Sequence, residues 1–300
     1  MRIAAIDIGS NAARLLINEV IEDGKKPVEF VKLNLLRIPL RLGMDVFTTG
    51  KIGEEREMMT LKTMTIFSDL MKMYHVEHYR ACATSAMRDA KNGQEILKKV
   101  KNESGISIEI ISGDEEATLV FENHSAEILD QNSAYLYIDV GGGSTELTFF
   151  ESGRMVFEKS FNIGTIRLLN GLVTKEMWKE MQDCIHENIT SDKSISAIGS
   201  GGNINKIFSM SKTKDGKPMA TAYLKKYFSE LNELTVKERM RKYNFREDRA
   251  DVIVPALKIF NNVMHWAKIS KIFVPKISVA DGLIKSIYAD VKLKESLVKN

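Results

Sequence analysis

Residues 3–17, IAAIDIGSNAARLLI, and residues 135–150, YLYIDVGGGSTELTFF, share one layout. Each is an apolar strand that ends in an aspartate, Asp7 or Asp139, and returns through a glycine-bearing turn as a second apolar strand. Turn glycines let backbone N–H groups approach phosphate oxygens, and a nearby carboxylate can hold Mg²⁺ directly or through water. One such hairpin carries little information, because glycine turns join strands in many proteins. Two copies half a chain apart predict duplicated domains that face one phosphate chain.

Composition indicates an ordinary globular protein. The chain has 300 residues, 44% of them hydrophobic and 28% charged, which favours two domains of usual size. Its formal net charge of +3 gives no reason to expect a nucleic-acid polymer or a membrane surface as a partner. The 2 cysteines are too few for a disulfide framework or a zinc site. With no leader-like N-terminus and no membrane-length apolar run, we expect a cytoplasmic protein.

Hydrophobic periodicity predicts the same order of elements in both halves, three strands followed by alternating helices and strands. Such alternation calls for α/β sheets with covered faces, and the repeat supports a duplication. We expect domains at residues 1–130 and 131–300, divided near the polar stretch Asp130–Ser133, with the last helix, from residue 281 to 300, packing back on the first domain. The helices that we expect after these strands span Glu54–Tyr74, Ser85–Lys101, Asp114–Ile128, Lys175–Ile189, Ile204–Ser211 and Arg249–Trp266.

A third glycine loop, Gly199 to Asn203, separates a short apolar strand from a helix. In that position Gly201 and Gly202 can present bare amides to an anion at a helix N-terminus. The loop lacks the lysine of a P-loop and the spacing of a Rossmann fingerprint, which excludes both of those motifs. The alternative is a tight strand–helix turn without a ligand.

Ser85 and Arg88 follow another predicted strand. Ser85 is expected to cap the helix, and Arg88, about one turn further on, could reach an anion with its guanidinium group. The alternative for Arg88 is a solvated side chain paired with a nearby carboxylate.

Acidic residues supply the remaining candidates. Asp114, Glu115 and Glu116 open a predicted helix, where acids usually complement the helix dipole. The functional alternative is a general base, because hydrolysis of a phosphoanhydride needs a carboxylate to orient and deprotonate water. Glu146 leaves the second turn close to Asp139, and the two carboxylates together could complete a Mg²⁺ site.

Other residue types show no functional pattern. The histidines are interpreted as ordinary surface or core residues, because they lack metal-ligand spacing; they are His75, His78, His124, His186 and His265. A lysine-rich stretch, from Lys206 to Lys226, is interpreted as a solvated face.

These motifs in order resemble the exopolyphosphatase and guanosine pentaphosphate phosphohydrolase family of the actin-like ATPase superfamily. The matching segments are AAIDIGSNAARLLI, ATSAMRDAKN, IEIISGDEEATLVF, LYIDVGGGSTEL, IGSGGNINKI, RADVIVPA and SVADGLIKSI. ISGDEEA followed by IDVGGGSTEL is the most specific part. The resemblance implies two RNase H-like domains of the actin-like ATPase fold with a central cleft, and Mg²⁺-dependent hydrolytic removal of a terminal phosphate.

The resemblance also implies residue roles. Glu116 matches the family's water-activating base, whereas Asp7, Asp139 and Glu146 match acids of the metal and phosphate site. The positions that match phosphate-binding residues are Ser10, Asn11, Arg88, Gly142, Gly143, Ser144 and Thr145. The other glycines of the three loops are further candidates for binding phosphate: Gly9, Gly141, Gly201 and Gly202. A homodimer is compatible with the family.

The sequence leaves polyphosphate and guanosine pentaphosphate open as substrates, since both present the same terminal anhydride. Two other functions remain as alternatives: a small-molecule kinase of the same superfamily and a non-catalytic sensor that binds polyphosphate or the nucleotide.

Overall fold

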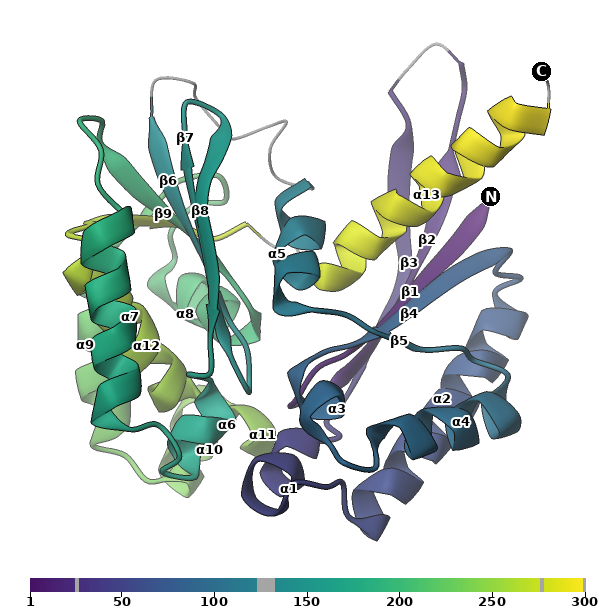
Figure 1. The fold of residues 1–300 in the computed structure, drawn as a ribbon, viewed down its shortest axis with the longest axis horizontal. Helices are drawn as coiled ribbons and strands as arrows, with labels where there is room; N and C mark the ends of the chain where they lie inside the picture. The colour runs from purple at the N-terminus through teal and green to yellow at the C-terminus, as the bar shows by residue number, and fades with distance from the viewer. Residues whose placement is uncertain (25–26, 123–132, 276–277, 299–300) are drawn as a thin grey trace. The chain divides into compact units, whose positions relative to one another are not determined.

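The computed structural model describes residues 1–24, 27–122, 133–275 and 278–298. The chain forms two compact units (Figure 1). The first comprises Met1–Asn123 together with Ser278–Asn300, and the second comprises His124–Ile277. The expected boundary at residues 130 and 131 lies outside the described residues.

The first unit contains a mixed sheet in the order β3-β2-β1-β4-β5. Its central strand is β1 (Arg2–Ile8), which pairs antiparallel with β2 (Ala13–Ile21). The other strands of the sheet are β3 (Glu29–Ile38), β4 (His78–Ala83) and β5 (Glu109–Ile110). The helices of this unit are α1 (Leu42–Thr49), α2 (Glu54–Met73), α3 (Ser85–Asp89), α4 (Gly93–Ser104), α5 (Gly113–Glu122) and α13 (Val279–Val298).

Helices cover both faces of this sheet. Alternation along β1 and β2 directs Ala4, Ile6 and Leu15 into a core with α2 and α4. Ile3 and Leu16 face the other way and are also buried, on the side where α13 contacts β1, β2 and β4. α5 packs against α13. The sheet face that carries Asp7, next but one to Ala5 on β1, is therefore the face on which α13 lies.

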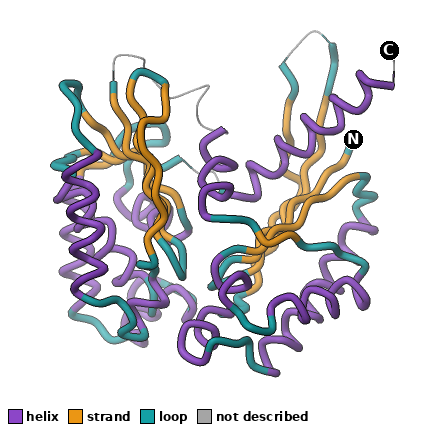
Figure 2. The backbone as a smooth tube through the Cα atoms, viewed as in Figure 1, coloured by secondary structure: helices purple, strands orange, loops and turns teal. Residues whose placement is uncertain are grey.

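The second unit repeats this plan in a sheet of order β10-β11-β9-β6-β7-β8. Its strands are β6 (Ala134–Val140), β7 (Thr145–Glu151), β8 (Arg154–Phe161), β9 (Ile195–Ser200), β10 (Met219–Ala220) and β11 (Lys271–Phe273). Its helices are α6 (Thr165–Leu169), α7 (Lys175–Asn188), α8 (Gly202–Ser211), α9 (Thr221–Asn232), α10 (Val236–Tyr243), α11 (Glu247–Ala250) and α12 (Ile253–Trp266). The core lies between the sheet and helices that include α7, α9 and α12 (Figure 2).

Several expected helices differ from the observed ones. The stretch Ser85–Lys101 forms two helices, α3 and α4, because Ala90 is extended and breaks the helix. The stretch Arg249–Trp266 likewise divides into α11 and α12. Four helices were not expected at all: α1, α6, α9 and α10. The part of the expected helix Asp114–Ile128 beyond residue 122 lies outside the described residues.

A search of the helices in the described ranges found none whose length and apolar composition would suit a membrane span.

Candidate active site

The first hairpin, β1–β2, pairs its aspartate with an arginine. Asp7 lies directly opposite Arg14 in the antiparallel register, and Arg14 Nη1 donates to Asp7 Oδ2 at 2.9 Å. The aspartate side chain is 5% exposed, and the arginine side chain 28%. Burial raises the pKa of Asp7 above its usual value, and the arginine offsets only part of this rise. A buried carboxylate with a raised pKa beside a glycine turn is a physical indication of a functional site.

The loop of this hairpin, Gly9 to Ala12, has its carbonyls bound from one side. Gly9 N donates to Ala12 O at 3.0 Å and closes the turn. The carbonyls of Ser10 and Asn11 accept from the amides of Gly43 and Arg41, at 2.9 and 3.0 Å, at the start of α1. Because the carbonyl and the N–H of a trans peptide point in opposite directions, the amides of Asn11 and Ala12 face away from α1. They are thus oriented toward the side where an anion could approach.

Two further candidates of the first unit lie beside this loop. Ser10 Oγ and Ser85 Oγ share a buried hydrogen bond of 2.8 Å. The expectation that Ser85 caps α3 was wrong, because Thr84 is the N-cap residue and no side chain caps that helix. Arg88 Nη1 donates to Ile111 O at 2.9 Å, which links α3 to the segment that leads into α5. Its side chain is 33% exposed and 4.0 Å from Asp89.

α5 begins with the three acids. Ser112 Oγ accepts from Glu115 N at 3.0 Å and so caps the helix. Glu115 Oε1 is held by Arg80 Nη2 at 2.8 Å, in a network that includes Glu109. Glu116 lies in the same first turn and is half-buried. Arg80 thus engages Glu115, and Glu116 stays the proposed base because it matches the family's water-activating position.

The second hairpin, β6–β7, pairs its aspartate with a second acid. Asp139 lies directly opposite Glu146, so the two side chains project from the same face of the sheet. They are 8% and 3% exposed. Ser160, opposite Glu146 on β8, donates to Glu146 Oε1 at 3.0 Å. Two carboxylates on one face of a sheet supply the hard oxygen ligands that a divalent cation prefers, and this makes the pair a candidate cation site.

The loop of the second hairpin, Gly141 to Ser144, has its carbonyls bound by α6. The amides of Thr165 and Ile166 donate to Gly141 O and Gly142 O at 3.0 and 2.8 Å, and Arg167 Nε donates to Gly143 O at 2.8 Å. The amides of Gly142, Gly143 and Ser144 therefore point away from α6. Thr145 directs its hydroxyl inward, to Ile163 O at 2.5 Å.

Gly164 allows the start of α6 to lie close to the loop Gly141 to Ser144. A Cβ atom at this position would lie 2.3 Å from Gly142 O and 2.4 Å from the carbonyl carbon of Gly143. Both are backbone atoms, which cannot swing aside as a flexible side chain could. Only glycine therefore fits here without moving the loop.

The third glycine loop lies beside the second. Asp139 on β6 is paired with Ser200 at the end of β9. Gly201 is the N-cap residue of α8, with φ of 109°, and a Cβ there would lie 3.2 Å from Val140 O and 3.6 Å from Asp139 Oδ1. The Asp139 carboxylate therefore reaches the start of α8, where Gly202 is the first helical residue.

Sequence reasoning missed four residues that position these groups: Arg14, Ser160, Gly164 and Arg167. A signal existed for Arg14, because the short turn fixes which residue faces Asp7. Ser160 and Arg167 act through pairing and packing that the local sequence does not specify.

Within the described ranges, no group of three or more His, Cys, Asp or Glu side chains is placed to hold a metal ion. Asp139 and Glu146 nevertheless have the chemistry that Mg²⁺ prefers, which is hard oxygen ligands, usually one or two carboxylates with phosphate oxygens and water. The pair therefore fits such an ion.

Comparisons with known proteins agree on one family. The Ppx/GppA phosphatase family matches residues 23–290. Exopolyphosphatase 2 of Mycobacterium tuberculosis is 34% identical over 172 residues, which cover 56% of this chain and 53% of that protein. Guanosine-5'-triphosphate,3'-diphosphate pyrophosphatase of Aeromonas hydrophila is 32% identical over 56% of this chain and 32% of its own length. These matches span about half or less of each curated relative.

Solved structures confirm the expected fold of two α/β domains. The Aquifex aeolicus PPX-GPPA enzyme has 26% sequence identity and a TM-score of 0.73, covering 95% of this chain and 99% of that one. An exopolyphosphatase from Cytophaga hutchinsonii has a TM-score of 0.80 at 24% identity, covering 95% and 97% of the two chains. The chain belongs to the Ppx/GppA phosphatase family.

Proposed function

We propose that this protein is a Mg²⁺-dependent phosphohydrolase that removes the terminal phosphate of inorganic polyphosphate or the 5′ phosphate of guanosine pentaphosphate. The observation that carries the proposal is the repeated loop. In each unit, amides turn away from the helix that binds the loop carbonyls, beside a buried aspartate. Amides and helix termini of this kind are the usual ligands of phosphate oxygens.

Each candidate has a role in this reaction. The loop amides and Arg88 would bind the phosphate chain and hold the terminal phosphorus in line with a water molecule. Asp139 and Glu146 would hold Mg²⁺, with Asp7 as a third acid, and the bound ion would offset charge on the phosphoryl oxygens.

Glu116 would accept the proton from the attacking water. The water oxygen bonds to the terminal phosphorus, the bridging P–O bond breaks, and the shortened chain leaves as an anion with orthophosphate as the other product. This step requires positioning and charge stabilisation more than covalent chemistry from the protein.

One experiment tests the proposal against its alternatives. Phosphate release is measured with tripolyphosphate, long-chain polyphosphate, guanosine pentaphosphate and ATP, each with and without Mg²⁺ and with no acceptor present. We expect Mg²⁺-dependent release from a polyphosphate or from the pentaphosphate. No free phosphate without an acceptor, together with phosphoryl transfer to an acceptor added in a parallel sample, would indicate a kinase, and binding without release would indicate a sensor. The Glu116→Gln protein, purified identically, controls for contaminating phosphatases.

A further inference from the structure

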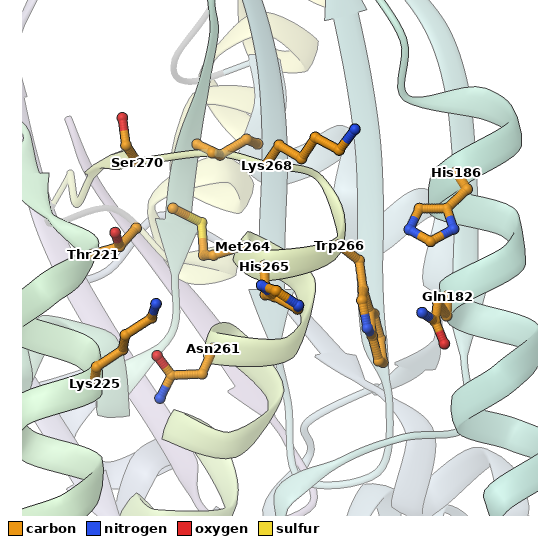
Figure 3. Close-up of a pocket in the computed structure, with 11 residues that line it drawn as sticks. Gln182, His186, Thr221, Lys225, Asn261, Met264, His265, Trp266, Lys268 and Ser270 are labelled. Carbon is orange, nitrogen blue, oxygen red and sulfur yellow. The ribbon is translucent and has the colours of Figure 1, made fainter.

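The second unit has a pocket of about 400 Å³ that the proposed reaction does not use (Figure 3). Its walls come from α7, α9 and α12 and from the segment that joins α12 to β11. The residues that define its chemistry are Gln182, His186, Lys225, His265, Trp266 and Lys268.

The pocket and the glycine loops lie at opposite ends of the parallel strands of this sheet. Residues 268–270 line the pocket and lead directly into β11. Because β11 runs parallel to β9, and β9 to β6, the pocket lies where these three strands begin. The glycine loops follow the ends of β6 and β9. A strand of 6 residues, such as β9, is about 20 Å long, so this distance separates the start of the strands from the glycine loops at their ends.

The lining is cationic. Lys225 and Lys268 contribute ammonium groups, and His186 and His265 contribute imidazoles. Neither lysine forms an ion pair within the described part of the chain, and no carboxylate from that part lines the pocket. Such a lining attracts an anion, and phosphate oxygens accept hydrogen bonds from ammonium and imidazole N–H groups.

Lys268 occupies a backbone conformation that favours glycine, with φ of 54°. The turn it forms satisfies the end of α12, because Lys268 N and Ile269 N donate to His265 O and Met264 O at 3.1 and 2.9 Å. These carbonyls are therefore engaged within the chain. This turn places Lys268 between α12 and β11, where it lines the pocket.

The remaining walls suit a flat ring. Trp266 packs edge-on against Trp178, with ring centroids 5.9 Å apart, and Met264 and Ile269 are buried at 2% and 5% exposure. Asn261 Nδ2 donates to Leu224 O at 3.4 Å, which ties α12 to α9. In Figure 3, Lys225 and Asn261 lie on the left of the pocket, Trp266, His186 and Gln182 on the right, and His265 between them.

We propose that this pocket is a second, non-catalytic site that binds a nucleoside phosphate. Lys225 and Lys268 bind the phosphate groups, and the base lies against Trp266, with the Gln182 carboxamide available to its polar edge. Stacking on an aromatic ring and a charge-assisted grip on phosphate are the two contacts by which proteins commonly bind nucleotides.

The chain supplies its own reporter for the test. It has 2 tryptophans: Trp266 lines the pocket, and Trp178 contacts the ring of Trp266. Tryptophan fluorescence is titrated with GDP and, separately, with pyrophosphate, both in EDTA, and calorimetry on the same samples detects binding that leaves fluorescence unchanged. We expect saturable quenching by GDP, with pyrophosphate binding at least roughly tenfold more weakly because it lacks a base.

Two double variants localise the site. Lys225→Ala/Lys268→Ala should weaken GDP binding by at least roughly tenfold, without changing phosphate release from tripolyphosphate. Lys214→Ala/Lys237→Ala removes the same charge outside the pocket and should bind GDP as the native chain does. The proposal is overturned if GDP gives neither quenching nor heat, if pyrophosphate binds as tightly as GDP, or if the two double variants bind GDP equally.

Discussion

The two hairpins have the same backbone and place different side chains opposite their aspartates. In both, the amide of the first loop residue donates to the carbonyl of the fourth at 3.0 Å. In both, the aspartate near the end of the first strand lies opposite the second residue of the returning strand. That opposite residue is Arg14 in the first hairpin and Glu146 in the second. The two hairpins therefore share a way of presenting amides, while the residue beside each aspartate differs in charge.

This difference separates two tasks. The first hairpin pairs its buried aspartate with Arg14, which offsets part of the effect of burial. The second hairpin places two carboxylates face to face, an arrangement that a divalent cation stabilises. We infer that the first loop contributes mainly phosphate binding, whereas the second also carries most of the metal requirement.

Glu116→Gln should lower turnover by at least roughly a hundredfold, the size expected for loss of a positioned general base. The fold should be unchanged, because the amide replaces a half-buried carboxylate of nearly equal shape. Steady-state phosphate release and circular dichroism measure the two quantities.

Glu115→Gln is the matched control for Glu116. Arg80 holds Glu115 at 2.8 Å, so its loss should change turnover much less. If instead the Glu115 variant loses turnover and the Glu116 variant keeps it, the base has been assigned to the wrong residue of the pair.

Gly164→Ala should destabilise the second unit by at least about 2 kcal/mol, because the added methyl group meets the backbone of the glycine loop. For a unit of this size that corresponds to a drop in melting temperature of roughly 4–8 °C, measured by calorimetry. Gly9→Ala is the comparison in the first unit, where a Cβ would be 3.6 Å from its nearest neighbour, Ala12 O. Equal losses of stability in the two variants would contradict the close-approach explanation.

Asp139→Asn should raise the Mg²⁺ concentration for half-maximal activity by roughly tenfold, since it removes one ionic ligand of the proposed site. Asp7→Asn should raise it less, because Arg14 already offsets the charge of Asp7. Mg²⁺ titrations of both variants decide the matter. Equal shifts would mean that both hairpins bind metal to the same extent.

Arg14→Gln should cost about 1–2 kcal/mol of unfolding free energy at pH 7, because it leaves the buried Asp7 carboxylate without its cation. The loss should be smaller at pH 4. The pKa of Asp7 is raised in the folded protein, so its contribution to stability is largest at low pH and falls as pH rises through that pKa. Removal of Arg14 makes this fall steeper.

Urea unfolding at both pH values measures the effect of Arg14→Gln, with Arg2→Gln as the control for an exposed pair. A loss that is larger at pH 4 than at pH 7 would be inconsistent with a raised pKa at Asp7.

The sequence predicted the strands and loops of both hairpins well, because local rules decide them. Apolar runs such as Ala134–Val140 end at a glycine turn and return, and the register follows from the turn. The acids were found for the same reason, since they lie within or next to the turns. α10 also has a local signal in the sequence, the capping box formed by Thr235 and Glu238.

The short helices that bind the loop carbonyls could not be predicted in the same way. α1 follows Arg41 in a left-handed conformation and α6 follows Gly164, and neither has a side-chain cap. Their positions depend on hydrogen bonds to loops that are distant in sequence. Tertiary packing decides these elements, and with them Gly164 and Arg167.

The position of α13 has a consequence for how the chain is made. Ser278–Asn300 belong to the first unit, although the whole second unit precedes them in the chain. As the ribosome synthesises the protein, His124–Ile277 can emerge and fold while the earlier sheet still lacks the helix that covers Ile3, Ala5 and Leu16. Domains generally fold as units during synthesis, so the nascent chain should complete its second unit first and its N-terminal unit last. Chaperones that bind exposed apolar strands would find their target in β1 and β2 until the final turns of α13 leave the exit tunnel.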